Sequence, residues 1–366
     1  MCCVIRSDSV AMIHHSFYAL LKFMTRNSFY IKSTAQISIQ QPLCEDWMEN
    51  PIWYDSSFVR SLEPDYKQFI PPMEARRMTR IMKRALTTSN VAIKKSGLVL
   101  PDAIITGTGW GCMENTEQFL DVLCNEGEQL LKPTLFMQST HNTISSHIAI
   151  NTHNNGYNIT YSHRCVSFDM ALFDAYLQYK SGKIDSALVG SHDEVTPTSF
   201  ILLKKMGLVG CDDEICGEAS VSTVLSSTPS DAHSAVAAIR IIYKPSVSEI
   251  NSTVNQLLAD AEMCPEDISA VMVGISGNKT TDKPYYDIVD NCFSDKTILH
   301  YKHVFGECFS ASAFGFYAAD CCLKYGYIPD FLYVDKSRGM VGTPKNILLI
   351  NHSDGKNFSF ILLKSV

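Results

Sequence analysis

The chain has 366 residues, of which 46% are hydrophobic, and its formal net charge at pH 7 is −7. A chain of this length and composition can bury one large core or two packed halves, and it has no basic stripe of the kind that binds nucleic acid. No apolar stretch reaches the roughly 18 residues that predict a transmembrane helix, so we expect neither a nucleic-acid partner nor a transmembrane segment.

The thirteen cysteines do not indicate a disulfide scaffold, because the chain is long and has no convincing export signal. We therefore expect a cytoplasmic protein. The closest cysteine pair, Cys211 and Cys216, lacks a second pair at metal-ligand spacing, and no histidines form a tight ligand pair, so no metal site is expected. Residues 1–27 are interpreted as a non-native or disordered extension, and the alternative is a short interfacial helix.

Strand-like and helix-like segments alternate after residue 28. Residues 28–38 are strand-like, and residues 73–97 place Met78, Ile81 and Met82 at helical spacing, with a glycine just behind them. The segments that follow are a buried strand ending in glycines (102–111), helices at 113–127 and 143–155, and a short strand at 157–160.

The clearest helix follows Cys165, where Phe168, Leu172 and Ala175 share one face and Gly182 ends the helix. The later segments are strands at 185–195, 220–227, 235–244, 268–277, 345–354 and 358–366, and helices at 246–263, with a capping box of Ser246 and Glu249, and at 310–326. Alternating helices and continuously apolar strands predict an α/β fold whose sheets are covered on both faces.

Cys165 lies between a strand and a helix, as the nucleophile does in a nucleophile elbow. The helix dipole and free backbone N–H groups at that position favour the thiolate, and His163 is placed to perturb the thiol. Free cysteines are nevertheless among the most buried residues, so a packing role remains open.

The loop GTGWG, residues 107–111, does not have the spacing of a dinucleotide-binding fingerprint, and a tight strand-to-helix turn is the favoured reading. No cofactor is therefore expected.

The segment NITYSHRCVSFDMALFDAYLQYKSGKIDSALVGSHDE resembles the active-site segment of β-ketoacyl synthases, which carry a nucleophilic cysteine in a strand-to-helix elbow. In both, the helix ends at a glycine seventeen residues after the cysteine, and Gly182, Asp185, Gly190 and Asp193 fall at matching positions. GTGWGC, CGEASVSTVL (216–225) and YKHVFGECFSASAFG (301–315) resemble further elements of that family, in the same order.

The resemblance implies a thiolase-like layered αβαβα fold of two similar halves, an N-terminal half at 28–232 and a C-terminal half at 233–366. It also implies that acyl thioesters and an acyl carrier protein are partners, and that the chain forms a heterodimer with a homologous ketosynthase subunit or a homodimer. No cofactor is implied.

The active-site positions depart from the family pattern. Ser276 stands where the family has its first catalytic histidine, and Glu307 stands where it has the second, five residues after a retained Lys302. The resemblance marks Cys165, Ser276, Lys302 and Glu307 as the catalytic positions, and Thr280, Ser353, Gly355 and Asn357 as substrate-binding positions.

The two replacements weaken the family's decarboxylative condensation. That reaction places negative charge on a thioester oxygen, and the loss of one preorganised donor typically costs about 10²–10³ in rate. An ionised Glu307 accepts hydrogen bonds only, repels the enolate, and disfavours a thiolate at Cys165.

Three functional hypotheses follow. The first is a non-catalytic subunit that resembles the chain-length factors of aromatic polyketide, aryl polyene and related pigment pathways, or of fatty acid biosynthesis. The second is an acyltransferase or thioesterase in which Cys165 accepts an acyl group and Glu307 serves as base, with Ser276 or His163 assisting. The third is a binding module for an acyl chain or carrier arm.

Overall fold

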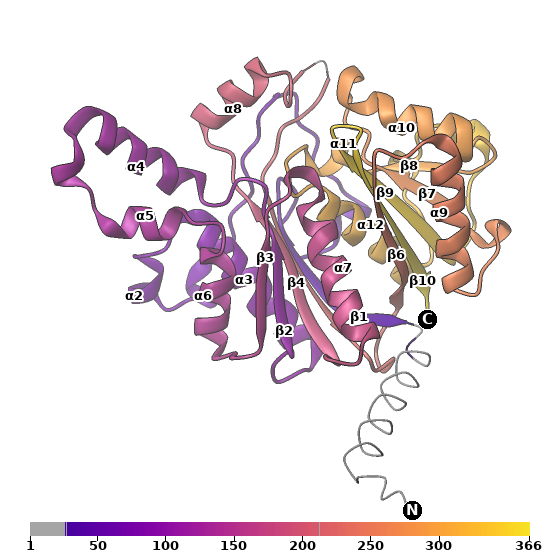
Figure 1. The fold of residues 1–366 in the computed structure, drawn as a ribbon, viewed down its shortest axis with the longest axis horizontal. Helices are drawn as coiled ribbons and strands as arrows, with labels where there is room; N and C mark the ends of the chain where they lie inside the picture. Colours follow the sequence, from indigo (N-terminus) through magenta and orange to yellow (C-terminus); the bar gives the residue numbers. More distant parts are fainter. Residues whose placement is uncertain (1–25, 27, 212) are drawn as a thin grey trace, which may run out of the picture.

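The computed structural model describes residues 26, 28–211 and 213–366 (Figure 1). The extension predicted for residues 1–27 therefore lies outside the described residues, apart from Arg26. The buried Arg26 guanidinium donates to the backbone carbonyls of Tyr179 and Ile184, at 2.9 and 2.7 Å, and forms an ion pair with Asp185. Arg26 thus packs against the end of the helix that follows Cys165.

In the described residues a mixed sheet of ten strands runs in the order β3-β2-β4-β5-β1-β6-β10-β9-β7-β8. Each half contributes five strands, and the order of the second half mirrors that of the first about the β1–β6 pair. In each half the three outermost strands are parallel and the other neighbours are antiparallel. The strands are β1 (Phe29–Ile37), β2 (Ala103–Gly107), β3 (Tyr157–Tyr161), β4 (Ser186–Asp193), β5 (Ala219–Ser226), β6 (Ser234–Tyr243), β7 (Ala270–Val273), β8 (Ile298–His300), β9 (Asn346–Ser353) and β10 (Asn357–Ser365).

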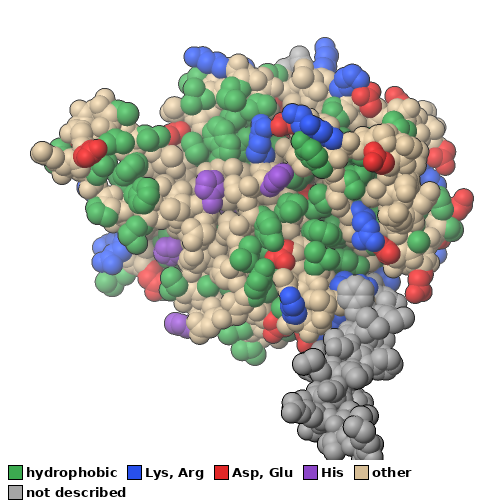
Figure 2. Space-filling view, viewed as in Figure 1, with side chains coloured by type: hydrophobic (Ala, Val, Ile, Leu, Met, Phe, Trp, Pro, Cys, Tyr) green, Lys and Arg blue, Asp and Glu red, His purple; other side chains and the backbone are tan. Residues whose placement is uncertain are grey.

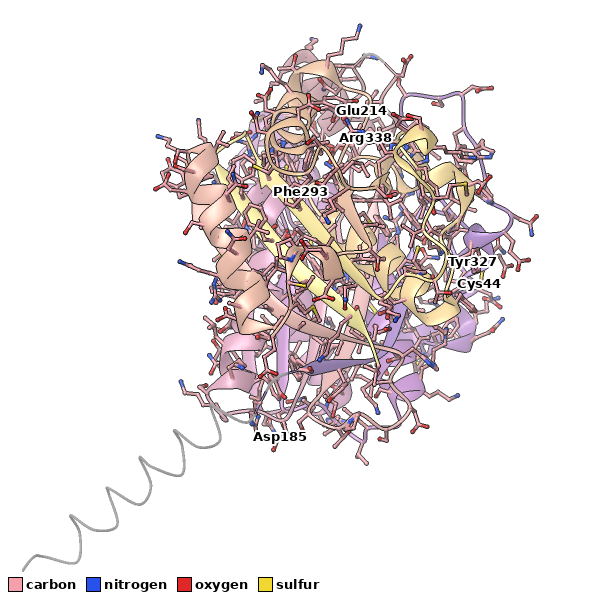
Figure 3. The ribbon with its side chains drawn as sticks, turned by 90° about the vertical axis from the view of Figure 1, so that its right-hand side faces the viewer. Cys44, Asp185, Glu214, Phe293, Tyr327 and Arg338 are labelled. Carbon is pink, nitrogen blue, oxygen red and sulfur yellow. The ribbon has the colours of Figure 1, made fainter. Side chains whose placement is uncertain are left out.

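Helices cover both faces of each half-sheet. Helices α3 and α6 pack on the outer face of the first half and α9 and α10 on that of the second, where α9 is seen from the side in Figure 3. Helices α7 and α12 pack together between the two halves. The helices of four residues or more are α2 (Pro72–Ala75), α3 (Arg80–Ser96), α4 (Met113–Glu126), α5 (Pro133–Ser139), α6 (Thr143–Thr152), α7 (Ser167–Lys180), α8 (Pro197–Lys205), α9 (Val247–Asp260), α10 (Lys279–Cys292), α11 (Lys302–Phe305) and α12 (Ser312–Tyr325).

The two central helices join through aromatic side chains. Phe168 of α7 and Phe316 of α12 are fully buried, and their ring centroids lie 5.4 Å apart in an edge-to-face arrangement. Burial of each such side chain stabilises the fold by roughly 1.5–3 kcal/mol. Across the molecule, the layers are therefore outer helices, a half-sheet, the central helices, the other half-sheet and outer helices. The predicted thiolase-like layered αβαβα fold of two similar halves is confirmed.

Four helices were absent from the sequence-based expectations: α5, α8, α10 and α11. Helix α10 contains Pro284, which interrupts a helical pattern in the sequence, although its start is capped by Asn278. Helix α8 is short, with Thr196 and Ser199 forming a capping box. The single helix predicted at 73–97 is two helices, α2 and α3.

No helix among the described residues combines the length and hydrophobicity needed to cross a bilayer.

Candidate active site

Cys165 lies in a short 3-10 turn, Arg164–Val166, between β3 and α7. A left-handed residue and two hydrogen bonds define this turn. Arg164 adopts a left-handed backbone conformation with φ of 50°, and its carbonyl accepts a 2.7 Å hydrogen bond from the Ser167 hydroxyl. Asn351 of β9 donates through Nδ2 to the Cys165 carbonyl at 2.7 Å. The elbow is therefore built by the first half and fixed by a strand of the second.

The glycine-rich loop at 107–111 allows close packing against this elbow. A Cβ atom at Gly107 would lie 2.5 Å from the backbone carbon of Ser167, and one at Gly109 would lie 2.3 Å from Phe309. The buried carboxylate of Asp193 accepts hydrogen bonds from the backbone N–H groups of Gly109 and Trp110. The loop thus serves as a tight packing turn.

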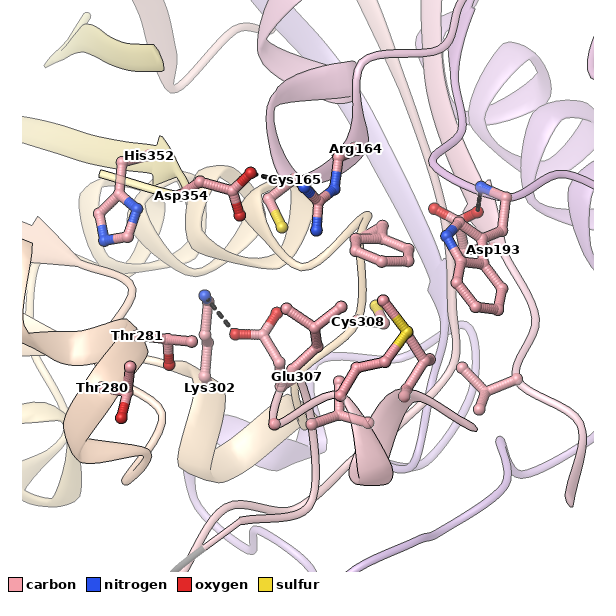
Figure 4. Close-up of a pocket in the computed structure, with 18 of the residues that line it drawn as sticks. Arg164, Cys165, Asp193, Thr280, Thr281, Lys302, Glu307, Cys308, His352 and Asp354 are labelled. Atoms are coloured by element: carbon pink, nitrogen blue, oxygen red, sulfur yellow. Dashed lines mark hydrogen bonds and ion pairs between the residues drawn. The ribbon is translucent and has the colours of Figure 1, made fainter. Parts of the chain in front are cut away.

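The Cys165 side chain lines a cavity of about 300 Å³ at the junction of the two halves (Figure 4). The thiol, Lys302 and Glu307 line this cavity together, and the rest of the lining mixes apolar side chains with charged ones such as Arg164, Glu194 and Asp354. The apolar lining includes Trp110, Val195, Leu203, Met206, Leu208, Val209, Pro284 and Phe309.

Lys302 and Glu307 form an ion pair at the polar end, with Nζ and Oε2 2.5 Å apart and exposed fractions of 6% and 7%. The chain between them reverses at Gly306, whose φ is 81°. A Cβ there would lie 2.9 Å from the backbone of Gly217, so only glycine fits. The Glu307 N–H donates to the carbonyl of Ile215 at 2.7 Å, which fixes the carboxylate in the cavity.

Burial and, after it, the Glu307 carboxylate together raise the pKa of the Cys165 thiol to about 12, against the opposing charges of Lys302 and Arg164. Loss of hydration at this half-buried position opposes the thiolate that the helix terminus was expected to favour, and Glu307 disfavours the thiolate as expected. His163 is exposed and does not line the cavity.

Burial also raises the pKa of the Glu307 carboxyl, against the neighbouring ammonium group of Lys302. For Lys302, burial alone lowers the pKa, but Glu307 outweighs it and holds the pKa well above the usual value. The ammonium group is therefore charged at neutral pH.

Ser276 follows β7 and does not line the cavity among the described residues. Its hydroxyl donates to Oδ1 of Asp282 at 3.1 Å, and its backbone N–H donates to the same oxygen at 2.9 Å. These bonds fix the loop to the start of α10 and leave the hydroxyl proton directed at a carboxylate.

The predicted substrate-binding positions are divided. Thr280 and Gly355 line the cavity. Ser353 is buried in β9 and pairs across the hairpin with Asn357 of β10, and neither lines the cavity.

Four residues that sequence reasoning did not select belong to this site. Arg164 and Asp354 form an ion pair of 2.5 Å between the elbow and the β9–β10 turn. His352 lines the cavity, and Glu214, labelled in Figure 3, is a buried carboxylate close enough to Glu307 to affect its own pKa. Arg164 is next to Cys165 in the sequence, and His352 is next to Ser353. Adjacency to these selected residues was therefore the only sequence signal that could have identified them. No sequence signal distinguishes Glu214.

Residues 59–222 match the family model of the β-ketoacyl synthase N-terminal domain. A comparison with curated proteins finds no significant match.

Several solved structures share the fold. The ishigamide ketosynthase/chain length factor gives a TM-score of 0.76 at 18% identity over 93% of this chain and 100% of that one. A β-ketoacyl synthase from Burkholderia phymatum gives 0.77 at 14% identity, with the same coverage of both chains. The ketosynthase ApeO in complex with its chain length factor ApeC, from Xenorhabdus doucetiae, gives 0.71 at 15% identity over 93% of this chain and 98% of that one.

Proposed function

We propose that this chain is a non-catalytic subunit of the chain-length-factor type; the match of residues 59–222 to the β-ketoacyl synthase N-terminal domain and the shared fold of the solved ketosynthases support this. It pairs with an active ketosynthase in the biosynthesis of a fatty acid or a polyketide, such as an aryl polyene or a related pigment. An acyl carrier protein delivers the growing chain to that complex.

The buried Lys302–Glu307 ion pair carries this proposal. Glu307 stands where the resemblance places the second histidine, and its carboxylate accepts hydrogen bonds at a point where condensation requires a donor. Burial first, and then the same carboxylate, raise the pKa of the Cys165 thiol, so little thiolate is present at neutral pH. The Ser276 hydroxyl proton is directed at Asp282 and supplies no replacement donor to the cavity.

Two features of the exposed surface of the first half favour the binding of a partner subunit. Strand β3 ends the sheet, and the described residues provide no strand beside its outer edge, where Tyr157 and Ile159 are 38% and 36% exposed. An open edge strand is a template for pairing with another chain. Hydrophobic side chains also gather over α4 and α5 (Figure 2), where Phe136 and Met137 are 57% and 68% exposed.

Reconstitution tests the proposal. The chain is purified alone and after co-expression with ketosynthases of pigment pathways, and each sample is supplied with acyl- and malonyl-loaded carrier protein. We expect no elongation by the chain alone, a heterodimer by native mass spectrometry, and elongation by that heterodimer. Elongation by the purified chain alone would contradict the proposal. The proposal would also be contradicted if the chain bound none of the ketosynthases tried.

One observation favours the second candidate, an acyltransferase or thioesterase. Cys165 lines the cavity together with Lys302 and Glu307, and burial raises the pKa of Glu307, which makes its carboxylate a better proton acceptor. Intact-mass measurement after incubation with acyl-loaded carrier protein distinguishes the two. An acyl adduct that is absent from a C165A variant favours the transferase, and no adduct under conditions that acylate a true ketosynthase favours the subunit.

A further inference from the structure

Helices α4 and α5 form an arm that projects from the first half and packs against little of it (Figure 1). Of the fourteen residues of α4 only Asn115 is buried, and neither α5 nor the short 3-10 turn at Glu128–Leu130 between them has a buried residue. The two helices pack on each other through Phe119 and Phe136, whose ring centroids lie 5.6 Å apart. Helices in proteins owe most of their stability to tertiary packing, so an arm that buries so little of its surface is suited to contact with another chain.

The base of the arm is anchored to the body of the molecule. The Glu114 N–H donates to Oε1 of Glu194 at 2.8 Å. Asn115 donates through Nδ2 to Oε1 of Gln138 at 3.0 Å, and Gln138 donates through Nε2 to the Arg77 carbonyl at 3.2 Å. These bonds connect the start of α4 and the end of α5 to the first half, so they give the arm a defined direction.

The arm presents large apolar side chains to solvent. Leu120 and Leu130 are 49% and 61% exposed, and Phe136 and Met137 are exposed to a similar degree. Figure 2 shows hydrophobic side chains gathered over both helices. Helix α5 contacts α6, and α6 contacts the open edge strand β3, so the arm continues the side of the molecule on which that edge lies. Exposed apolar patches of this kind mark sites of protein interaction.

The same arm is acidic. Residues 113–139 contain five acidic residues and one basic residue, Lys132, and the exposed carboxylates at the end of the arm are Asp121, Glu126 and Glu128. Two copies of one chain that pair about a two-fold axis present the same patch to each other. Like charges that face each other across an interface weaken association, whereas basic side chains on a different partner strengthen it.

We propose that this arm selects the partner of the chain. It docks on a ketosynthase subunit whose facing surface combines an apolar groove with Lys or Arg side chains, and its carboxylates disfavour the pairing of two copies of this chain. The inference rests on the proposed function for the class of partner and on the arm for the charge of that partner. It deepens the proposed function, because it accounts for a heterodimer in preference to a homodimer.

Self-association of the full chain tests the carboxylates without a partner. Analytical ultracentrifugation compares the wild type with D121N/E126Q/E128Q at low and at high salt. We expect the variant to self-associate roughly tenfold more tightly than the wild type at low salt, and we expect added salt to reduce that difference, because salt screens exposed charges. The control E262Q/E266Q/D295N removes three exposed carboxylates of the second half and should behave like the wild type.

The apolar side chains of the arm are tested in the same assay. Addition of F136S/M137S to D121N/E126Q/E128Q should abolish the gained association, because it removes the apolar contact. Three results would overturn the inference. The first is a D121N/E126Q/E128Q variant that associates no more tightly than the wild type, including the case in which both remain monomers. The second is an equal gain in the control, and the third is full association after F136S/M137S.

A heterodimer tests the charge of the partner. With a ketosynthase that elongates together with this chain in the reconstitution, D121K/E126K/E128K should weaken pairing at least tenfold at low salt, and less at high salt. Unchanged pairing by this variant would contradict the inference and leave the proposed function standing. Failure of the wild type to bind any ketosynthase would contradict the proposed function, and the self-association measurement would still decide the effect of the carboxylates.

Discussion

The two connections that lead into the central helices occupy equivalent places in the two halves and present opposite chemistry. In the first half, residues 162–166 link β3 to α7 by a short turn that carries the Cys165 thiol. In the second, residues 301–311 link β8 to α12 by a longer path that includes α11 and carries the Lys302–Glu307 ion pair. Both connections face one cavity.

The difference shows how one half controls the chemistry of the other. The thiol is neutral because it is buried and because the Glu307 carboxylate of the second connection opposes its ionisation. The chain therefore retains the strand-to-helix elbow that would position a nucleophile. The Glu307 carboxylate, however, disfavours the thiolate form of Cys165 that would act as that nucleophile. Four predictions test this contrast, in order of decreasing effect.

Removal of one member of the buried ion pair should produce the largest change. K302M and E307L should each lower the free energy of unfolding by about 3–5 kcal/mol, because each leaves a buried charged group without its partner. The double variant should be far less destabilised than the sum of the singles. K283M, in an exposed pair with Asp287, is the control and should be nearly neutral. Chemical denaturation measures all four, and additive single effects would contradict the coupling.

The charges of the pair should shift Cys165 reactivity in opposite directions. Glu307 raises the thiol pKa and Lys302 lowers it, so E307Q should accelerate alkylation by iodoacetamide about tenfold or more, and K302M should slow it. In the wild type, with a thiol pKa of about 12, the rate should rise about tenfold per pH unit from 7 to 10. Peptide mass spectrometry follows Cys165, with the exposed Cys124 as internal reference. Equal rates in both variants would show that the second connection does not control the thiol.

Glu214 should make stability depend on pH. Burial first, and then Glu307, raises its pKa from 4.5 to about 7 in the folded chain, so its contribution to stability is present below pH 4.5 and is lost as the pH rises through 7. E214Q should therefore gain about 1–3 kcal/mol of stability relative to the wild type at pH 8, and less at pH 4.5. Denaturation at both pH values measures this, and E128Q, at an exposed position, should show no such difference. A gain independent of pH would contradict it.

The Arg164–Asp354 pair should contribute least. It links the elbow to the β9–β10 turn at 2.5 Å, but its side chains are 44% and 40% exposed. A double-mutant cycle of R164A and D354A should give a coupling energy of roughly 0.2–1 kcal/mol that decreases with added salt. A coupling as large as that of Lys302 and Glu307 would remove the distinction between the exposed and the buried pair.

Much of the fold was predictable because its signals are local. Continuous apolar runs identified β4 and β7, and the Ser246–Glu249 capping box identified the start of α9, because such patterns act over a few residues. Helix α10 was missed because Pro284 interrupts its pattern, and its stability comes from packing against the sheet and from the Asn278 cap.

The sequence by itself determined that Cys165 lies at a strand-to-helix connection and that Glu307 stands five residues after Lys302. Only the tertiary structure decided which groups surround the thiol. Asn351 and Cys165 lie 186 positions apart in the chain, yet they are hydrogen-bonded, and His352 enters the cavity through that contact. The thiol pKa and the direction of the Ser276 proton both depend on burial and charge in three dimensions, which residue order along the chain does not encode.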